Sequence, residues 1–135
     1  MGRGIDYYLA MEGSLKLKEI SYIHSEAFQA GELKHGSISL IDKDFGVISI
    51  VTDKTISDKT ISNLKEVSSR GAKVIAITNI KEDFYDYSIE IDDYDEILNP
   101  LLVIVPMQML AYNVAKLKGC DIDKPRNLAK SVTVE

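Results

Sequence analysis

The sequence has few of the residues that build covalent or metal-stabilised frameworks. It contains one cysteine, Cys120, and two histidines, His24 and His35, in 135 residues. A single cysteine excludes an internal disulfide framework, and neither histidine has a cysteine or carboxylate at metal-ligand spacing. We therefore expect no metal and no other cofactor. The scarcity of cysteine favours a reducing compartment such as the cytoplasm.

Targeting segments and an excess of positive charge are also missing. The opening "MGRGIDYYLA" has no apolar core of the kind found in a signal peptide. The longest apolar run, "LLVIVPMQMLAY", is too short to cross a membrane and contains Pro106, so it predicts a buried helix. A net charge of −5 argues against nucleic acid and membrane surfaces as partners.

Helical and strand-like segments alternate along the rest of the chain. Residues 6–29 have helical spacing, with Leu9, Leu17, Ile20 and Ala27 on the side expected to face a core. "GELKHGSISLI" predicts a loop, because two glycines interrupt it. "SDKTISNLKEVSSRG" predicts a helix with a serine or aspartate N-cap, and a last helix is expected over about 99–118.

Three short apolar segments predict strands. "GVISIVT" and "AKVIAITN" are continuous β-branched runs, typical of strands buried on both faces, and "YSIEID" is a shorter third strand. Strands that alternate with helices indicate an α/β fold, a parallel sheet flanked by helices on both faces. "MGRG" is typical of the turn between a strand and a helix, so we expect the first strand to be truncated. Residues 1–119 would form the domain and residues 120–135 a C-terminal tail.

The strongest candidate for chemistry is a charged face on the first helix. Glu12, Lys16 and Glu19 are spaced by four and three residues, which brings both carboxylates within reach of the ammonium group. A solvated face of paired charges has the same spacing. The alternative is a carboxylate beside a lysine that moves protons to and from a substrate carbon.

Other candidates stand alone in the sequence. His24 lies beside the apolar stripe and is expected to be a core histidine, whereas His35 sits in the glycine-bounded loop "GELKHG", where a side chain can project. Lys130 lies near the end of the chain. It is either a surface lysine on a fraying tail or an amine that forms an imine with a sugar carbonyl.

Two long motifs make the chain recognisable. "EGSLKLKEISYIHSEAFQAGELKHG" and "AYNVAKLKGCDIDKPRNLAKSVTVE", together with "GRGIDY", closely resemble the C-terminal end of the glucosamine-6-phosphate synthase family, the glutamine:fructose-6-phosphate aminotransferases. The resemblance covers essentially the whole chain. It implies the second of two sugar-isomerase (SIS) domains, a flavodoxin-like three-layer sandwich, and it implies a dimer.

The resemblance also implies roles for individual residues. Glu19 matches the carboxylate that moves a proton between the first two sugar carbons, and Lys16 matches the lysine beside that base and the sugar. Lys130 matches the tail lysine that reacts with the open sugar's carbonyl, with Ala129 beside it at the substrate. His35 matches the histidine of ring opening, which in the family reaches into the neighbouring subunit's site.

The chain departs from the family pattern in three ways. Ser37 stands where the family usually has proline, for which we expect a local change in the loop. The glutaminase domain and the first SIS half, which carries the main phosphate-gripping loop, are missing from this sequence. We therefore expect proton-transfer and imine residues without the phosphate clamp, and no turnover of fructose 6-phosphate to glucosamine 6-phosphate by this chain alone.

Two other functions fit parts of the sequence. A non-catalytic sugar-phosphate-binding SIS module would have the same fold, but it would need none of Glu19, His35 and Lys130. A receiver-type signalling domain has similar length and acidity, with Asp53 and Thr78 near strand ends. It would also need an acidic pair after its first strand and a lysine after its last, and the sequence provides neither.

Overall fold

The computed structural model describes residues 1–95 and 97–128. Its elements, in chain order, are α1 (Ile5–Ser21), the 3-10 turns η1 (Glu32–His35) and η2 (Ser37–Leu40), β1 (Gly46–Val51), α2 (Ser57–Ser68), β2 (Lys73–Thr78), β3 (Tyr87–Glu90) and α3 (Asn99–Leu117). The loop expected over residues 31–41 thus contains two short 3-10 turns. The three strands and the last helix begin and end within two residues of their predicted positions.

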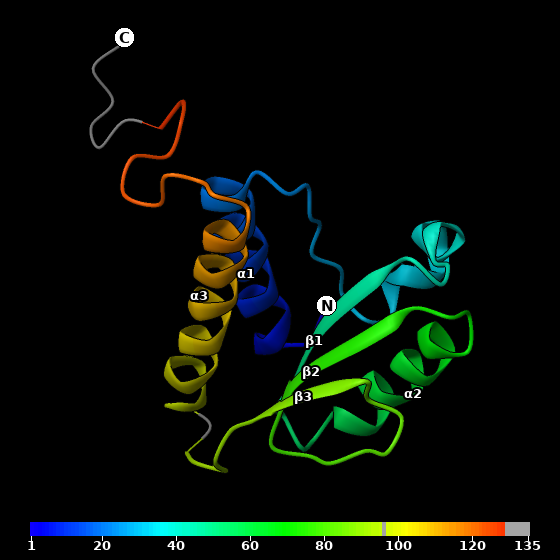
Figure 1. The fold of residues 1–135 in the computed structure, drawn as a ribbon. Coiled ribbons are helices and arrows are strands. Elements are labelled where there is room, and N and C mark those ends of the chain that lie inside the picture. The colour runs from blue at the N-terminus through cyan, green and yellow to red at the C-terminus, as the bar shows by residue number, and fades with distance from the viewer. Residues whose placement is uncertain (96, 129–135) are drawn as a thin grey trace, which may run out of the picture.

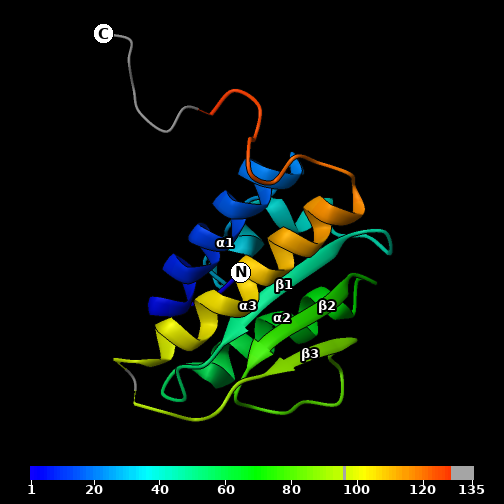
Figure 2. The same ribbon diagram turned by 60° about the vertical axis from the view of Figure 1, so that its left-hand side comes forward.

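A parallel sheet forms the middle layer, in the order β1-β2-β3. Helices α1 and α3 cover one face of the sheet and α2 covers the other, as Figures 1 and 2 show. The predicted fold class is therefore confirmed. β1 and β2 are largely buried. All four residues of β3 are exposed, because β3 is an edge strand that, among the described strands, pairs only with β2.

The first two residues lie against the other edge of β1. The Met1 carbonyl accepts a hydrogen bond from the Ile50 amide (3.0 Å), and the Met1 amine donates to the Ile48 carbonyl. Gly2 in turn forms a parallel bridge with Gln29. An extended segment therefore precedes α1 at the place where the strand-to-helix turn predicts a strand.

Two groups of buried side chains hold the layers together. Between α2 and the sheet, Leu64, Val67 and Val74 are completely inaccessible to solvent. On the other face, Ile77 and Val103 are equally buried in the contact of α1 and α3 with the sheet. Full burial of one such side chain contributes roughly 1.5–3 kcal/mol relative to exposure, so these layers fix where α1 lies.

α1 is shorter than its sequence pattern predicts. The helix ends at Ser21 rather than near Gln29, because Tyr22 adopts a left-handed backbone conformation (φ 58°, ψ 25°). Residues 22–28 then run back without helical structure, and Ser25 is held by hydrogen bonds to Ser14. Left-handed helix caps are usually glycine or asparagine, so a tyrosine in this position gave no stop signal.

The side of α1 that was predicted to face the core does so, with Leu9 packed against the buried cluster that α1 and α3 form with the sheet. Its buried apolar positions are Ala10 and Gly13, whereas Leu9 and Leu17 are only half-buried. A Cβ added to Gly13 would lie 1.7 Å from the Met107 Cε atom of α3. Small residues on α1 therefore allow the two helices to pack closely.

α3 is the most apolar helix of the described part of the chain. It has 19 residues, and an 18-residue window of it has a mean hydropathy of 1.4, so it is long and apolar enough to cross a membrane by length and composition alone. The sequence predicted that the apolar run is too short to cross a membrane. That is true of the run, but the helix that contains it is long enough. Only 22% of this window is buried, so the prediction of a buried helix is wrong for most of its surface. Val103, Met107 and Ala111 lie on the buried side, whereas apolar residues such as Leu101 and Val105 are exposed.

Candidate active site

The charges predicted to meet on α1 do so. The Lys16 Nζ atom lies 2.9 Å from Glu19 Oε2 and 3.3 Å from Glu12 Oε1. The hydrogen bond to Glu19 is the main reason that the pKa of Lys16 is raised above its ordinary value. Lys16 therefore remains an ammonium ion throughout the neutral range. It acts as a cation beside the carboxylate and not as a base.

In this arrangement the Glu19 carboxylate remains accessible to a bound molecule. Its side chain is 27% exposed and that of Lys16 is 33% exposed, so the pair is partly shielded yet open to solvent on one side. The ammonium group holds one carboxylate oxygen in place, which limits the conformations of Glu19. A fixed, accessible carboxylate beside a permanent cation can accept a proton from a carbon acid whose developing negative charge the cation stabilises.

The start of the C-terminal tail lies against the same end of α1. The Arg126 amide donates to the Tyr22 hydroxyl (2.9 Å), and the Arg126 guanidinium lies 4.2 Å from the centre of the Tyr22 ring. The Lys118 Nζ atom donates to the Ser21 carbonyl (2.6 Å). Ala129 and Lys130, the predicted sugar-contacting residues of the tail, lie outside the described residues.

These groups occupy the end of the domain opposite the carboxyl ends of the strands. In Figures 1 and 2, α1 and α3 run alongside each other, and the chain leaves α3 next to the last turn of α1. Open α/β sheets usually bind ligands at the carboxyl ends of their strands. Lys16 and Glu19 therefore do not face the usual binding edge of their own sheet.

The structure does not bring His35 into this group. His35 is exposed at the end of η1, and its side chain forms no hydrogen bond or ion pair with any described residue. Its neighbour Lys34 pairs with Glu66 of α2 at 2.7 Å. A projecting histidine on a separate element is available to a molecule outside this chain.

The expectation for His24 is wrong. His24 is exposed and follows the early end of α1, so the stripe to which it was assigned is not helical there. It borders an apolar cavity of about 310 Å³ between α1, α3 and β1, together with Leu17, Phe28 and Val47. Lys16 and Glu19 do not line this cavity.

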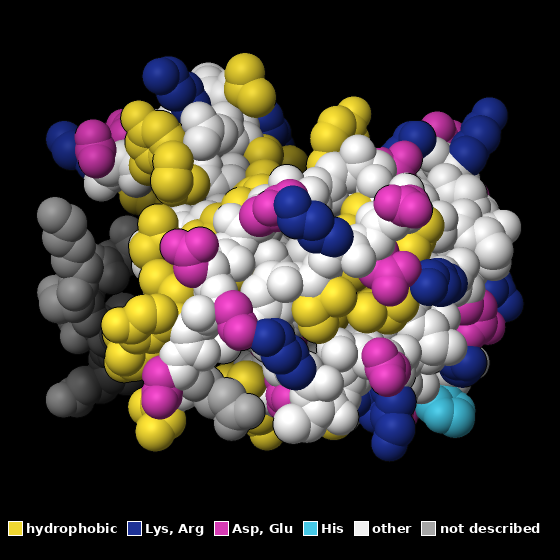
Figure 3. Space-filling view, turned by 90° about the horizontal axis from the view of Figure 1, so that it is seen from below, with side chains coloured by type: hydrophobic (Ala, Val, Ile, Leu, Met, Phe, Trp, Pro, Cys, Tyr) yellow, Lys and Arg dark blue, Asp and Glu magenta, His cyan; other side chains and the backbone are white. Residues whose placement is uncertain are grey.

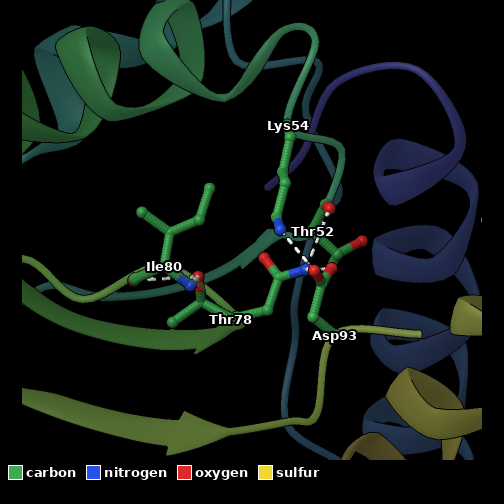
Figure 4. A network of polar contacts seen from close by, with 6 residues as sticks. Thr52, Lys54, Thr78, Ile80 and Asp93 are labelled. Atoms are coloured by element: carbon green, nitrogen blue, oxygen red, sulfur yellow. Dashed lines mark hydrogen bonds and ion pairs between the residues drawn. The ribbon is translucent and has the colours of Figure 1, made fainter.

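A polar network that the sequence did not predict lies at the carboxyl ends of the strands (Figure 4). The Asn79 amide donates to the Thr52 carbonyl (3.3 Å) and to Asp93 (3.1 Å), and Asp93 also pairs with Lys54. Polar residues that directly follow strand runs are the signal that could have indicated this cluster. The network links the loops after three strands.

The two residues that suggested a receiver domain have local structural roles. Asp53 accepts hydrogen bonds from the Thr55 amide (2.9 Å) and hydroxyl (2.6 Å), which forms a turn before α2. The Thr78 hydroxyl donates to the Val51 carbonyl at 2.7 Å. Asp53 is thus engaged in a turn and Thr78 in a contact between β2 and β1, and the two do not form a phosphoacceptor site.

The surface carries charges of both signs and apolar side chains. The face in Figure 3 shows acidic and basic side chains interspersed, with apolar side chains gathered on the side of α3. Leu98, Leu101 and Val105 are among the exposed apolar residues of that helix region. Within residues 1–95 and 97–128, no group of three or more His, Cys, Asp or Glu side chains is arranged to hold a metal ion.

Comparison with known proteins defines the class. The family profile of the SIS domain matches residues 1–118, and the chain belongs to the SIS domain family. The chain is also 56% identical, over its full length, to a glutamine–fructose-6-phosphate aminotransferase (isomerizing) of Clostridium perfringens, and 55% identical to the enzyme of that name from Caldanaerobacter subterraneus. It spans 23% of the length of each of these two relatives.

Solved structures agree with this assignment. The C-terminal domain of glucosamine-fructose-6-phosphate aminotransferase from Francisella tularensis is 43% identical, with a TM-score of 0.85 over 91% of this chain and 36% of that one. A glucosamine-6-phosphate deaminase from Thermotoga maritima is 28% identical, with a TM-score of 0.75 over 97% of this chain and 38% of that one.

Proposed function

We propose that this chain is the second sugar-isomerase domain of a glutamine–fructose-6-phosphate aminotransferase. The observation that carries the proposal is the Lys16–Glu19 pair at 2.9 Å, next to the attachment of the tail, in a chain so similar to these enzymes. The substrates are fructose 6-phosphate and ammonia from glutamine, and the product is glucosamine 6-phosphate. The partners are a glutaminase domain and a first SIS domain, and the assembly is a cytoplasmic homodimer.

Each residue has one task in the proposed reaction. The Lys130 amine adds to the carbonyl of the open sugar and water leaves, which makes the neighbouring C–H acidic. Glu19 removes the proton from one of the first two sugar carbons and returns it to the other. Lys16 keeps Glu19 in position and favours the negative charge that develops on the substrate. Residues 120–135 form the arm that brings Ala129 and Lys130 to the sugar.

His35 serves a different copy of the site. Imidazole can donate and accept protons near neutral pH, as opening the sugar ring requires. Its exposure on η1, separate from the Lys16–Glu19 pair, supports a role in the neighbouring subunit. The position of Lys16 and Glu19 away from the carboxyl edge of the sheet likewise supports a site that another domain completes, and this chain is inactive alone.

Chemical trapping tests the proposal. The chain is incubated with fructose 6-phosphate, reduced with borohydride and digested, and any adduct is located by peptide mass spectrometry. The run is repeated with the first SIS half added as a separate chain. We expect an adduct on Lys130 only with the added half, lost in Lys130→Ala and retained in the matched control Lys124→Ala.

Each other outcome excludes part of the proposal. No adduct in either run, with both halves folded, would favour a non-catalytic sugar-phosphate-binding module. An adduct on Lys130 without the added half would show that this chain binds the sugar by itself. Glucosamine 6-phosphate formed from fructose 6-phosphate and ammonia by the isolated chain would disprove its inactivity.

A further inference from the structure

Tyr22 combines a costly backbone conformation with contacts to a distant segment. Its φ of 58° is in the left-handed region, which favours glycine or asparagine. A non-glycine residue kept in such a conformation points to a use for its side chain. Here the side chain contacts Arg126, which is 104 residues further along the chain.

The contact has two independent parts. The Tyr22 hydroxyl accepts a hydrogen bond from the Arg126 backbone amide (2.9 Å), and the Tyr22 ring lies under the Arg126 guanidinium (4.2 Å). The hydrogen bond holds the backbone of the tail at Arg126, and the ring contact holds the Arg126 side chain. Both cations near this helix end, Arg126 and Lys118, are also placed where the helix dipole favours positive charge.

The position of the contact relates it to the proposed chemistry. Glu19 lies three residues before Tyr22, about 4.5 Å along the axis of α1. Lys130 lies four residues after Arg126, so its Cα atom stays within about 14 Å of that of Arg126 even if the chain is fully extended. The contact thus holds Arg126 at the last turn of α1, so the segment that leads to Lys130 starts from the helix end that carries the carboxylate.

We propose that Tyr22 and Arg126 are positioning residues that anchor the tail, so that the Lys130 amine is delivered beside Glu19. This inference rests on the proposed function. We call the two Tyr22–Arg126 contacts the tail anchor. Without the tail anchor, the last described contact that holds the chain to α1 is the hydrogen bond from Lys118 to the Ser21 carbonyl. Lys118 lies twelve residues before Lys130, whereas Arg126 lies four residues before it.

The expected size of the effect follows from this difference in tether length. The effective concentration of a group on a flexible tether falls roughly as the −3/2 power of its length. Lengthening the tether from four to twelve residues therefore lowers the local concentration of the amine about fivefold. Sugar binding by the rest of the site is unchanged, so the maximal trapping rate falls while the half-saturating concentration of fructose 6-phosphate stays the same.

The anchor itself is tested without any sugar. Tyr22→Gly removes the ring and hydroxyl but suits the left-handed backbone, and Tyr22→Phe removes the hydroxyl alone. Tyr94→Gly, at a tyrosine that is 63% exposed in another loop, is the matched control. We expect hydrogen exchange of the Arg126 amide and tryptic cleavage after Arg126 to rise at least threefold in Tyr22→Gly, with no change in Tyr94→Gly.

The positioning role is tested by borohydride trapping with the added first SIS half. We expect Tyr22→Gly and Arg126→Ala to trap the Lys130 adduct about fivefold more slowly at saturating fructose 6-phosphate, and Tyr22→Phe to lie between them and the parent. Unchanged exchange and cleavage in Tyr22→Gly would overturn the anchor. A lost anchor with an unchanged trapping rate would overturn the positioning role. No adduct in the parent chain would refute the proposed function and that role together, while the exchange data still decide whether the anchor exists.

Discussion

The buried carboxylate of Asp6 joins the start of α1 to the carboxyl end of β1. Asp6 Oδ2 accepts hydrogen bonds from the backbone amides of Thr52 (2.8 Å) and Asp53 (3.4 Å), and Oδ1 accepts one from the Thr52 hydroxyl (2.6 Å). The residue is only 3% exposed. The orientation of α1, and with it the face that carries the candidate site, depends on this connection.

Asp6→Asn changes these bonds with little change in shape. The amide oxygen can keep the two backbone donors, and the amide nitrogen can donate to the Thr52 hydroxyl, but every bond becomes one between neutral groups. The amide also brings a second N–H for which the partners of Asp6 offer no acceptor, and an unsatisfied buried donor costs about 1–3 kcal/mol. Removal of the charge offsets part of this, because burial disfavours the ionised carboxylate. We expect a loss of about 1–2 kcal/mol, or about 4–7 °C in Tm for a chain of this length.

Urea unfolding followed by circular dichroism measures the effect. Asp83→Asn, at an exposed aspartate, is the matched control and should leave the unfolding free energy within about 0.5 kcal/mol of the parent. An Asp6→Asn chain as stable as the parent, or more stable, would refute the reasoning. It would mean that removing the buried charge gains at least as much as the unpaired amide N–H costs.

The pH dependence provides a second, independent check. Burial raises the pKa of Asp6 above its ordinary value of 3.8, although the hydrogen bonds from Thr52 oppose this. The folded chain therefore binds the Asp6 proton more tightly than the unfolded chain. Between the raised pKa and pH 3.8 the parent gains stability on acidification. Asp6→Asn lacks this gain, so its deficit should widen as the pH falls through that window and become constant below it.

Two further predictions concern packing and surface charge. Gly13→Ala should change stability little, because the flexible end of Met107 can move and alanine favours the helix, whereas Gly13→Val should lose about 1–3 kcal/mol in a thermal melt. The Lys73 ammonium lowers the pKa of Asp86, so this pair adds stability above the ordinary pKa of 3.8 and loses it as the pH falls through the lower folded value. Asp86→Asn should flatten that part of the acid denaturation curve, and an unchanged curve would contradict the assignment.

The elements of the sheet could be predicted from the sequence because their signals are local. The runs "GVISIVT" and "AKVIAITN" are apolar and β-branched, and each is followed by polar turn residues, so the ends of β1 and β2 were clear. The meeting of Lys16 with Glu19 followed from helical spacing alone. These features depend on residues within a few positions of one another.

The features that were missed depend on contacts between distant residues. α1 ends where Tyr22 turns into a left-handed conformation that is held in part by Arg126, and no pattern near Tyr22 indicates this. The pattern did place Leu9 on the core side of α1, but it did not show that the most deeply buried positions there are Ala10 and Gly13, where α3 packs closely. In both cases a contact with a distant segment decided what the local pattern could not show.

The order in which the chain can fold follows from how α1 is held. β1, α2 and β2 are consecutive in sequence, so they can associate early with short loops to close. α1 depends instead on partners far along the chain, since Asp6 bonds to Thr52 and its helix packs on α3. Long-range contacts of this kind form late and slow folding. The helix that carries Lys16 and Glu19 is thus expected to dock last and to open first, which makes this end of the domain easy for a neighbouring domain to remodel.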